Sequence, residues 1–174
     1  MIYIGVDLGK EGAVVFLDEK GKIVKKAKTP LLKAATVKGK KGKDEYDIVG
    51  MRAILTEAKE MDAVAMIERA QPLPAVLGGS LANYQRGLSF GLWQGLLVGL
   101  EIPYEVVRPQ DWQKVMLLGV NSTYDTKQAS VIAAQRLWPK EDWRRSERAT
   151  KADDGYTDSA LLAEFGRRRR NGQA

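Results

Sequence analysis

Three short apolar runs at the start of the chain, separated by glycine turns, constrain the fold more than any other feature. Residues 2–7, 13–17 and 23–27 are rich in Ile, Val and other residues that favour strands. The turns at residues 8–12 and 18–22 are short, whereas two parallel strands need a crossover connection of about a dozen residues. The sequence therefore predicts an antiparallel meander of three strands.

Helices and further strands alternate after the meander. Strands are predicted over residues 63–68 and 104–108, and the lysine- and glycine-rich residues 33–45 predict a basic loop. Apolar residues at helical spacing predict helices over residues 47–60, 81–100, 125–137 and 154–166, and a short helix that opens at 111–114.

This order of elements indicates an α/β fold with one domain. We expect a five-stranded mixed sheet, an antiparallel meander followed by parallel strands, with helices on both faces. The domain is expected to span residues 1–166, and residues 167–174 to form a basic tail.

The composition excludes several kinds of chemistry. The chain has 174 residues but contains neither cysteine nor histidine. Disulfides, thiolate metal sites, cysteine nucleophiles, histidine-based triads and zinc sites with histidine ligands are therefore excluded. Hydrolysis by this chain would depend on carboxylates, which hold hard divalent cations through oxygen.

The charge is uneven along the chain. The net charge is +6; residues 1–50 contribute +4, residues 140–174 contribute +2, and the segment between them is neutral. Two basic flanks favour a polyanionic partner such as nucleic acid, although a basic surface also serves solubility. Because the chain starts directly in a strand and has no uninterrupted run of 18 apolar residues, we expect a cytoplasmic protein without a membrane partner.

Acidic residues stand at three places where the local pattern disfavours them. Asp7 lies in the first apolar strand and Glu68 ends the run at 63–68. A buried carboxylate is costly unless it is paired or binds a metal ion. Asp154 and Asp158 are spaced i and i+4, so they share one face of the last predicted helix and would repel each other there. Asp153 is either an N-cap or a substitute for Asp154.

Each acid alone has an ordinary explanation, because a strand-end glutamate is often a surface residue and a helix-start aspartate is often a cap. Together, in a chain without histidine or cysteine, they are typical of a two-metal phosphoryl-transfer site. Such a site holds two divalent ions about 4 Å apart, on either side of the reacting phosphate.

Five stretches of the chain resemble the ribonuclease H-like nucleases. Within these nucleases they are most similar to the RuvC-type Holliday junction resolvases, especially the phage-encoded branch. The stretches are Ile-Gly-Val-Asp-Leu-Gly at 4–9, Ile-Glu-Arg-Ala-Gln-Pro at 67–72, Phe-Gly-Leu-Trp-Gln-Gly at 90–95, Ile-Pro-Tyr at 102–104 with Val-Arg-Pro-Gln-Asp-Trp at 107–112, and Asp-Gly-Tyr-Thr-Asp-Ser-Ala-Leu-Leu at 154–162. The chain departs from the bacterial members, which usually have Asp-Pro-Gly where this one has Asp-Leu-Gly.

The resemblance implies a metal-dependent endonuclease that cuts four-way DNA junctions as a homodimer, by paired symmetric nicks. It also implies that Asp7, Glu68, Asp154 and Asp158 ligate two Mg²⁺ ions, for which Mn²⁺ can substitute, with Asp7 between them. The alternatives are a nuclease for branched DNA generally or for structured RNA, and a non-catalytic junction-binding protein. The strand around Asp7 also resembles the phosphate-binding strand of sugar kinases and actin, but those proteins need a second domain to enclose a nucleotide, so we expect no nucleotide cofactor.

Basic residues and one glycine stripe complete the predicted interfaces. By resemblance, Lys127 faces DNA, with Lys114 as a companion. Cellular members have an aromatic wedge after the strand-end glutamate; Leu73 or Tyr84 would replace it here. The further basic residues expected to contact phosphates are Arg86, Lys151, Arg144, Arg145, Lys38, Lys40 and Lys41. Gly87, Gly91 and Gly95 form the stripe, which serves either close packing within one subunit or a dimer interface.

Overall fold

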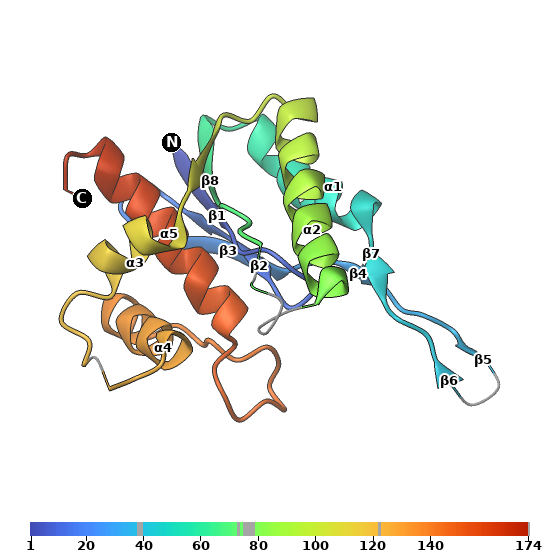
Figure 1. Ribbon diagram of the computed structural model, residues 1–174. Coiled ribbons are helices and arrows are strands. Elements are labelled where there is room, and N and C mark those ends of the chain that lie inside the picture. Colours follow the sequence, from blue (N-terminus) through green and yellow to red (C-terminus); the bar gives the residue numbers. More distant parts are fainter. Residues whose placement is uncertain (38–39, 73, 75–78, 122, 174) are drawn as a thin grey trace.

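A five-stranded mixed sheet forms the centre of the molecule (Figure 1). The structure, a computed structural model, describes residues 1–37, 40–72, 74, 79–121 and 123–173. The meander is formed by β1 (Ile2–Val6), β2 (Ala13–Leu17) and β3 (Ile23–Lys28), which pair antiparallel. On the other side of β1 lie two parallel strands, β8 (Ala63–Glu68) and β9 (Tyr104–Val107). The order β3-β2-β1-β8-β9 confirms the predicted sheet.

Helices cover both faces of the sheet, as predicted. One face carries α1 (Ile48–Lys59) and α2 (Ser80–Gly99). The other carries α3 (Pro109–Met116), α4 (Thr126–Leu137) and α5 (Asp154–Arg170) (Figure 1). β2 is apolar throughout because its alternate side chains enter the two cores: Val14 and Phe16 point toward α1 and α2, and Val15 and Leu17 toward α5. Within the described ranges, no helix has both the length and the apolar character needed to cross a membrane.

An aspartate caps the start of three helices, at or next to the positions where the sequence predicts these helices to start. Asp47, Asp125 and Asp153 each accept a hydrogen bond from the backbone N–H three residues further on, at the start of α1, α4 and α5. This bond satisfies one of the backbone donors that the first turn of a helix leaves free. The helix starts are therefore local properties of the sequence.

The predicted basic loop at 33–45 is wrong in part, because short antiparallel ladders form within this segment and at its ends. β4 (Leu31–Leu32) pairs with β7 (Glu45–Tyr46), and β5 (Thr36–Val37) pairs with β6 (Lys40–Lys41). Together they form an arm that projects from the body of the protein (Figure 1). Two-residue ladders depend on backbone hydrogen bonds and leave no apolar alternation in the sequence.

The expected end of the last helix at Gly166 and the solvated tail after it are also corrected. α5 continues to Arg170, because the arginines of its last turn have acidic partners. Arg167 and Arg168 bind the buried carboxylate of Glu164 at 2.7 and 2.8 Å, and Arg169 binds Glu105 at 3.0 Å. Cations in the last turn also interact favourably with the helix dipole.

A close approach between α5 and β1 sets the position of the last helix. A Cβ atom at Gly5 would lie only 1.8 Å from the carbonyl oxygen of Ser159, so only glycine allows the helix to pack directly on the strand. Because Gly5 lies two residues before Asp7, this contact brings the first two turns of α5 to the end of β1 where Asp7 stands.

Candidate active site

The four predicted carboxylates line one cleft. Asp7 directly follows β1, Glu68 ends β8, and Asp154 and Asp158 occupy the first two turns of α5. β1 and β8 are parallel neighbours, so their carboxyl ends meet at the same edge of the sheet. The cleft at this edge has a volume of about 840 Å³, and all four side chains contribute to its wall. The structure thus brings the four together, and their catalytic role stays a prediction.

The carboxylates of Asp7 and Asp158 are partly buried near each other and near Glu68. Burial raises the pKa of Asp7 well above its ordinary value, and the neighbouring carboxylates of Asp158 and Glu68 raise it further. Burial, together with Glu68 and Asp154, raises the pKa of Asp158 to about 7, although Ser130 and Lys127 act in the opposite direction. The Oδ1 atom of Asp158 is also buried and has no hydrogen-bond partner in the described part of the chain. A cation bound at this point would give the Oδ1 atom a partner and offset the repulsion between the carboxylates.

Lys127 supplies positive charge at the rim of the cleft. Its Nζ atom lies 2.5 Å from the Asp154 carboxylate, although 77% of the lysine side chain is exposed. Burial alone would raise the pKa of Asp154, but the hydrogen bond and the charge of Lys127 hold this pKa below its ordinary value. Conversely, the hydrogen bond to Asp154 raises the pKa of Lys127. This pair stands at the surface, so a competing ligand can reach either partner.

The donor set fits a divalent metal ion in its chemistry. Carboxylate oxygens are the ligands that Mg²⁺ prefers, and the Asp158 Oδ1 atom, which has no hydrogen-bond partner among the described residues, is available to such an ion. Among the described residues, no group of three acidic side chains is already arranged around one point, and Asp154 is occupied by Lys127. Ion binding would therefore require Asp154 to exchange its ammonium partner for the metal.

Asp153 does not take part in this cleft. Its carboxylate caps α5 and forms ion pairs with Lys28 at 2.6 Å and with Arg145 at 3.4 Å. Asp154, one residue later, lines the cleft instead. Of the two adjacent aspartates, Asp154 is therefore the one placed to act as a ligand, and Asp153 has a structural role.

Glu68 has a partner that sequence reasoning did not identify. The indole N–H of Trp112 on α3 donates a hydrogen bond of 2.9 Å to Glu68 Oε2. Burial raises the pKa of Glu68, while this hydrogen bond and the charge of Arg86 lower it. The two residues are 44 positions apart in the sequence, so no local pattern connects them.

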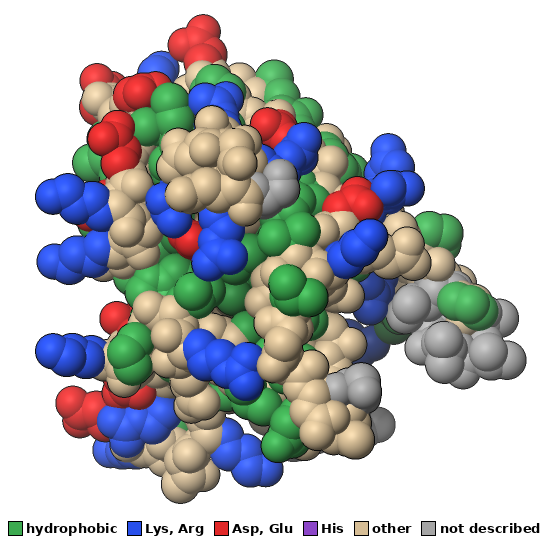
Figure 2. Space-filling model, turned by 90° about the vertical axis from the view of Figure 1, so that its left-hand side faces the viewer, with side chains coloured by type: hydrophobic (Ala, Val, Ile, Leu, Met, Phe, Trp, Pro, Cys, Tyr) green, Lys and Arg blue, Asp and Glu red, His purple; other side chains and the backbone are tan. Residues whose placement is uncertain are grey.

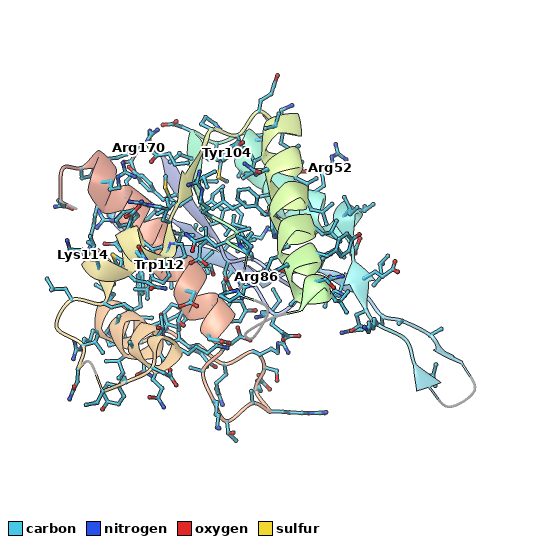
Figure 3. All side chains as sticks on the ribbon, in the orientation of Figure 1. Arg52, Arg86, Tyr104, Trp112, Lys114 and Arg170 are labelled. Carbon is cyan, nitrogen blue, oxygen red and sulfur yellow. The ribbon has the colours of Figure 1, made fainter. Side chains whose placement is uncertain are left out.

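Several basic side chains surround the carboxylates. Lys127 and Arg86, both predicted to contact DNA, line the cleft, and so does Lys43 from the basic segment. Figure 3 shows Arg86 beside α2, toward α5. Lys10 and Arg69 also line the cleft and were missed by the sequence reasoning. Their positions in the sequence could have indicated that they lie near the carboxylates, because Arg69 directly follows Glu68 and Lys10 lies in the turn after Asp7.

Other predicted DNA contacts lie elsewhere. Lys114 and Lys151 are exposed but do not line the cleft, and Figure 3 shows Lys114 on the side of the molecule away from α2. Arg144 is paired with Asp142 at 2.8 Å, and Arg145 is paired with Glu11 and Asp153.

The face that carries α3, α4 and the end of α5 holds basic side chains scattered among acidic ones rather than gathered in a patch (Figure 2). The side chains of three further lysines that are predicted to contact phosphates are not described. Lys38 lies outside the described residues, and only the backbone of Lys40 and Lys41 is described.

The glycine stripe of α2 faces outward. A Cβ atom at Gly87, Gly91 or Gly95 would meet no atom of the described chain within 4 Å. Close packing within one subunit, one of the two interpretations of the stripe, is therefore wrong. Tyr84, one of the two candidate wedge residues, is 62% exposed on the same helix, whereas Leu73 lies outside the described residues.

Comparison with known proteins shows what this architecture is. No protein-family model and no curated protein sequence matches the chain. Among solved structures, RuvC of Thermus thermophilus in complex with a Holliday junction substrate matches with a TM-score of 0.61 and 10% sequence identity, over 100% of this chain and 98% of that one. The chain has a RuvC-like fold. A second T. thermophilus RuvC structure matches with a TM-score of 0.56 and 13% identity, with the same coverage of both chains.

This likeness confirms the expected ribonuclease H-like fold. At such low identity it shows the fold alone, so the activity has to be argued from the cleft.

Proposed function

We propose that the protein is a metal-dependent endonuclease that resolves four-way DNA junctions. The observation that carries this proposal is the convergence of Asp7, Glu68, Asp154 and Asp158 in one cleft, where a buried Asp158 oxygen has no hydrogen-bond partner among the described residues. Carboxylates that repel one another persist in a folded protein when binding to a cation repays their cost. The surrounding lysines and arginines attract an anion to the same place.

The four carboxylates would hold two Mg²⁺ ions, with Mn²⁺ as a substitute. When bound, such ions lower the pKa of an attacking water and neutralise charge on the reacting phosphate. This supply of activated water suits a chain that lacks histidine, because no side-chain base of ordinary pKa near 7 is available.

The chain's own residues would position the substrate. Lys127, once separated from Asp154, is free to bind a phosphate oxygen at the rim of the cleft. Arg86, Lys10 and Arg69 line the same cleft and would hold the flanking phosphates. Contacts of this kind give affinity and strong salt dependence but read little sequence.

A homodimer would supply the second active site that paired nicks require. Each glycine inside an exposed helix costs about 1 kcal/mol relative to alanine, and no contact within the described part of the chain explains Gly87, Gly91 or Gly95. A second copy whose helix packs closely against this stripe would explain them. The T. thermophilus RuvC structure with a Holliday junction substrate supports junction DNA as the partner.

On the sequence resemblance we also propose that the chain belongs to the phage-encoded branch and acts in a bacterium or an infected host cell.

The test is cleavage of four-way, three-way, flap, duplex and RNA-containing substrates with Mg²⁺, Mn²⁺ or EDTA. We expect cleavage of the four-way junction with either metal and none with EDTA. Asp7→Asn and Glu68→Gln should abolish cleavage and leave junction binding within a few-fold. Asp62→Asn, a change at an aspartate whose side chain is 74% exposed, is the control and should cleave normally.

Two results would change the assignment. Equal cutting of flaps and four-way junctions would replace the junction-specific activity by a broader branched-DNA nuclease, and preferential cutting of structured RNA would indicate an RNA nuclease. Wild-type cleavage by Asp7→Asn would refute the metal site itself.

A further inference from the structure

Trp112 makes a contact that core packing alone does not require. Its side chain is 1% exposed and belongs to the core beneath α3, together with Met116. From this buried position its indole N–H donates to Glu68 Oε2 at 2.9 Å. The acceptor is thus a carboxylate at the wall of the cleft rather than a group of the core.

The other tryptophans show that this fold does not demand a partner for every buried indole. Trp93 and Trp143 are 0% and 3% exposed, and neither indole N–H has a hydrogen-bond partner in the described structure. Trp138 donates to the backbone carbonyl of Gly21 at 2.7 Å. The bond from Trp112 to a candidate metal ligand therefore calls for an explanation beyond satisfaction of a buried donor.

The consequence for Glu68 is a fixed carboxylate. A glutamate side chain has three rotatable bonds, and a free carboxylate at a strand end would lose this freedom each time it bound a cation. The Trp112 hydrogen bond holds Oε2 in place in the folded protein and leaves the other oxygen, Oε1, for a ligand. α3 also packs against α5, which carries Asp154 and Asp158, so Trp112 connects Glu68 to the helix that presents the other acids.

We propose that Trp112 is a positioning residue that holds Glu68 in the orientation needed to bind a divalent cation. The proposal rests on the metal-dependent function proposed above. Hydrogen-bond partners of metal ligands, one step removed from the ion, commonly set metal affinity, and their loss costs about 10–100-fold in affinity or activity.

The experiment compares Trp112→Phe with Trp93→Phe in the full-length protein. Both changes shorten a fully buried aromatic side chain, but only the first removes a hydrogen bond to Glu68. Mn²⁺ binding is measured directly, by electron paramagnetic resonance of the free ion, and junction cleavage is measured as a function of Mn²⁺ concentration. Unfolding temperature and circular dichroism establish that each variant is folded.

We expect Trp112→Phe to weaken Mn²⁺ binding about tenfold or more and to regain most of its cleavage rate at saturating Mn²⁺. Trp93→Phe should bind Mn²⁺ within about twofold of wild type, because it loses packing alone. If Trp112→Phe does not fold, incorporation of β-(3-benzothienyl)alanine at position 112 keeps the shape of the side chain and removes the N–H. That variant should show the same loss of affinity.

Unchanged Mn²⁺ affinity in the position-112 variant, or an equal loss in Trp93→Phe, would overturn the role of Trp112. A wild-type protein that binds Mn²⁺ but cleaves no nucleic acid would overturn the proposed nuclease function, and the Mn²⁺ titration would still decide the role of Trp112. A wild-type protein that binds no Mn²⁺ would overturn both.

Discussion

Replacement of Asp158 by asparagine is expected to stabilise the metal-free protein at pH 8 and to abolish cleavage. The reason is the cost of an ionised carboxylate that is buried beside Asp7 and Glu68 with one oxygen unpartnered. Asparagine has nearly the same shape and carries no charge. Its side-chain amide N–H can also donate a hydrogen bond to the hydroxyl of Ser130, which is buried on α4 and interacts with the Asp158 side chain.

The magnitude follows from the pKa of Asp158, which is raised from 3.8 to about 7 in the folded protein. Each unit of pKa difference corresponds to about 1.4 kcal/mol, so the ionised group destabilises the fold by about 4 kcal/mol above pH 7. Because the folded-state pKa lies above that of the unfolded chain, the folded protein binds more protons between about pH 4 and pH 7. Stability from this group is therefore highest at low pH and falls as the pH rises through that window.

The assay is thermal unfolding in EDTA at a series of pH values. For a chain of this length, about 4 kcal/mol corresponds to an increase in unfolding temperature on the order of 10 °C at pH 8. The difference between Asp158→Asn and wild type should shrink toward zero near pH 4. Other titrating groups are common to both proteins and largely cancel in the comparison.

Asp154→Asn is the matched control. Lys127 holds the pKa of Asp154 below its ordinary value, so loss of this charge should not stabilise the protein at pH 8. The reasoning is refuted if Asp158→Asn is no more stable than wild type at pH 8, or if its advantage is the same at pH 4.

Three further predictions follow from the cleft and from α2. Millimolar Mg²⁺ or Mn²⁺ should raise the unfolding temperature of the wild type at pH 8 and leave that of Asp7→Asn nearly unchanged; equal shifts would place the ion elsewhere. Lys127→Met should slow single-turnover cleavage about tenfold or more, whereas Lys114→Met, outside the cleft, should cleave at nearly the wild-type rate. If the protein forms the proposed dimer, Gly91→Leu should convert it into monomers in sedimentation experiments, because its side chain would enter the proposed interface; a dimer of unchanged mass would exclude this helix face.

The main elements of the fold were predictable because their signals are local. The strand at residues 63–68 has the predicted bounds, since an apolar run bounded by turns needs no distant information. Likewise, three helices start at the aspartates that cap them. The two-residue ladders of the arm lack any such pattern. The extension of α5 to Arg170 depends in part on Glu105, which lies on β9 far away in the sequence.

Part of the candidate site was likewise predictable from local sequence patterns. The unusual positions of Asp7 and Glu68 in apolar strands, and the helical spacing of Asp154 and Asp158, are visible in the sequence and predicted which acids would meet. The choice of Asp154 over Asp153 also follows from helical phase, and the ion pairs of Asp153 with Lys28 and Arg145 explain it in the structure.

The sequence by itself determined the main elements, the acids available for the candidate site and the exclusion of histidine and cysteine chemistry, because these depend on residue type and on neighbours a few positions away. Tertiary structure alone decided which charges have partners. It tied Arg145 to Glu11, placed Lys10 and Arg69 in the cleft, turned the α2 glycines outward, and joined Trp112 to Glu68. Such pairings bring together groups far apart in the chain, and only the packing of helices against the sheet sets those distances.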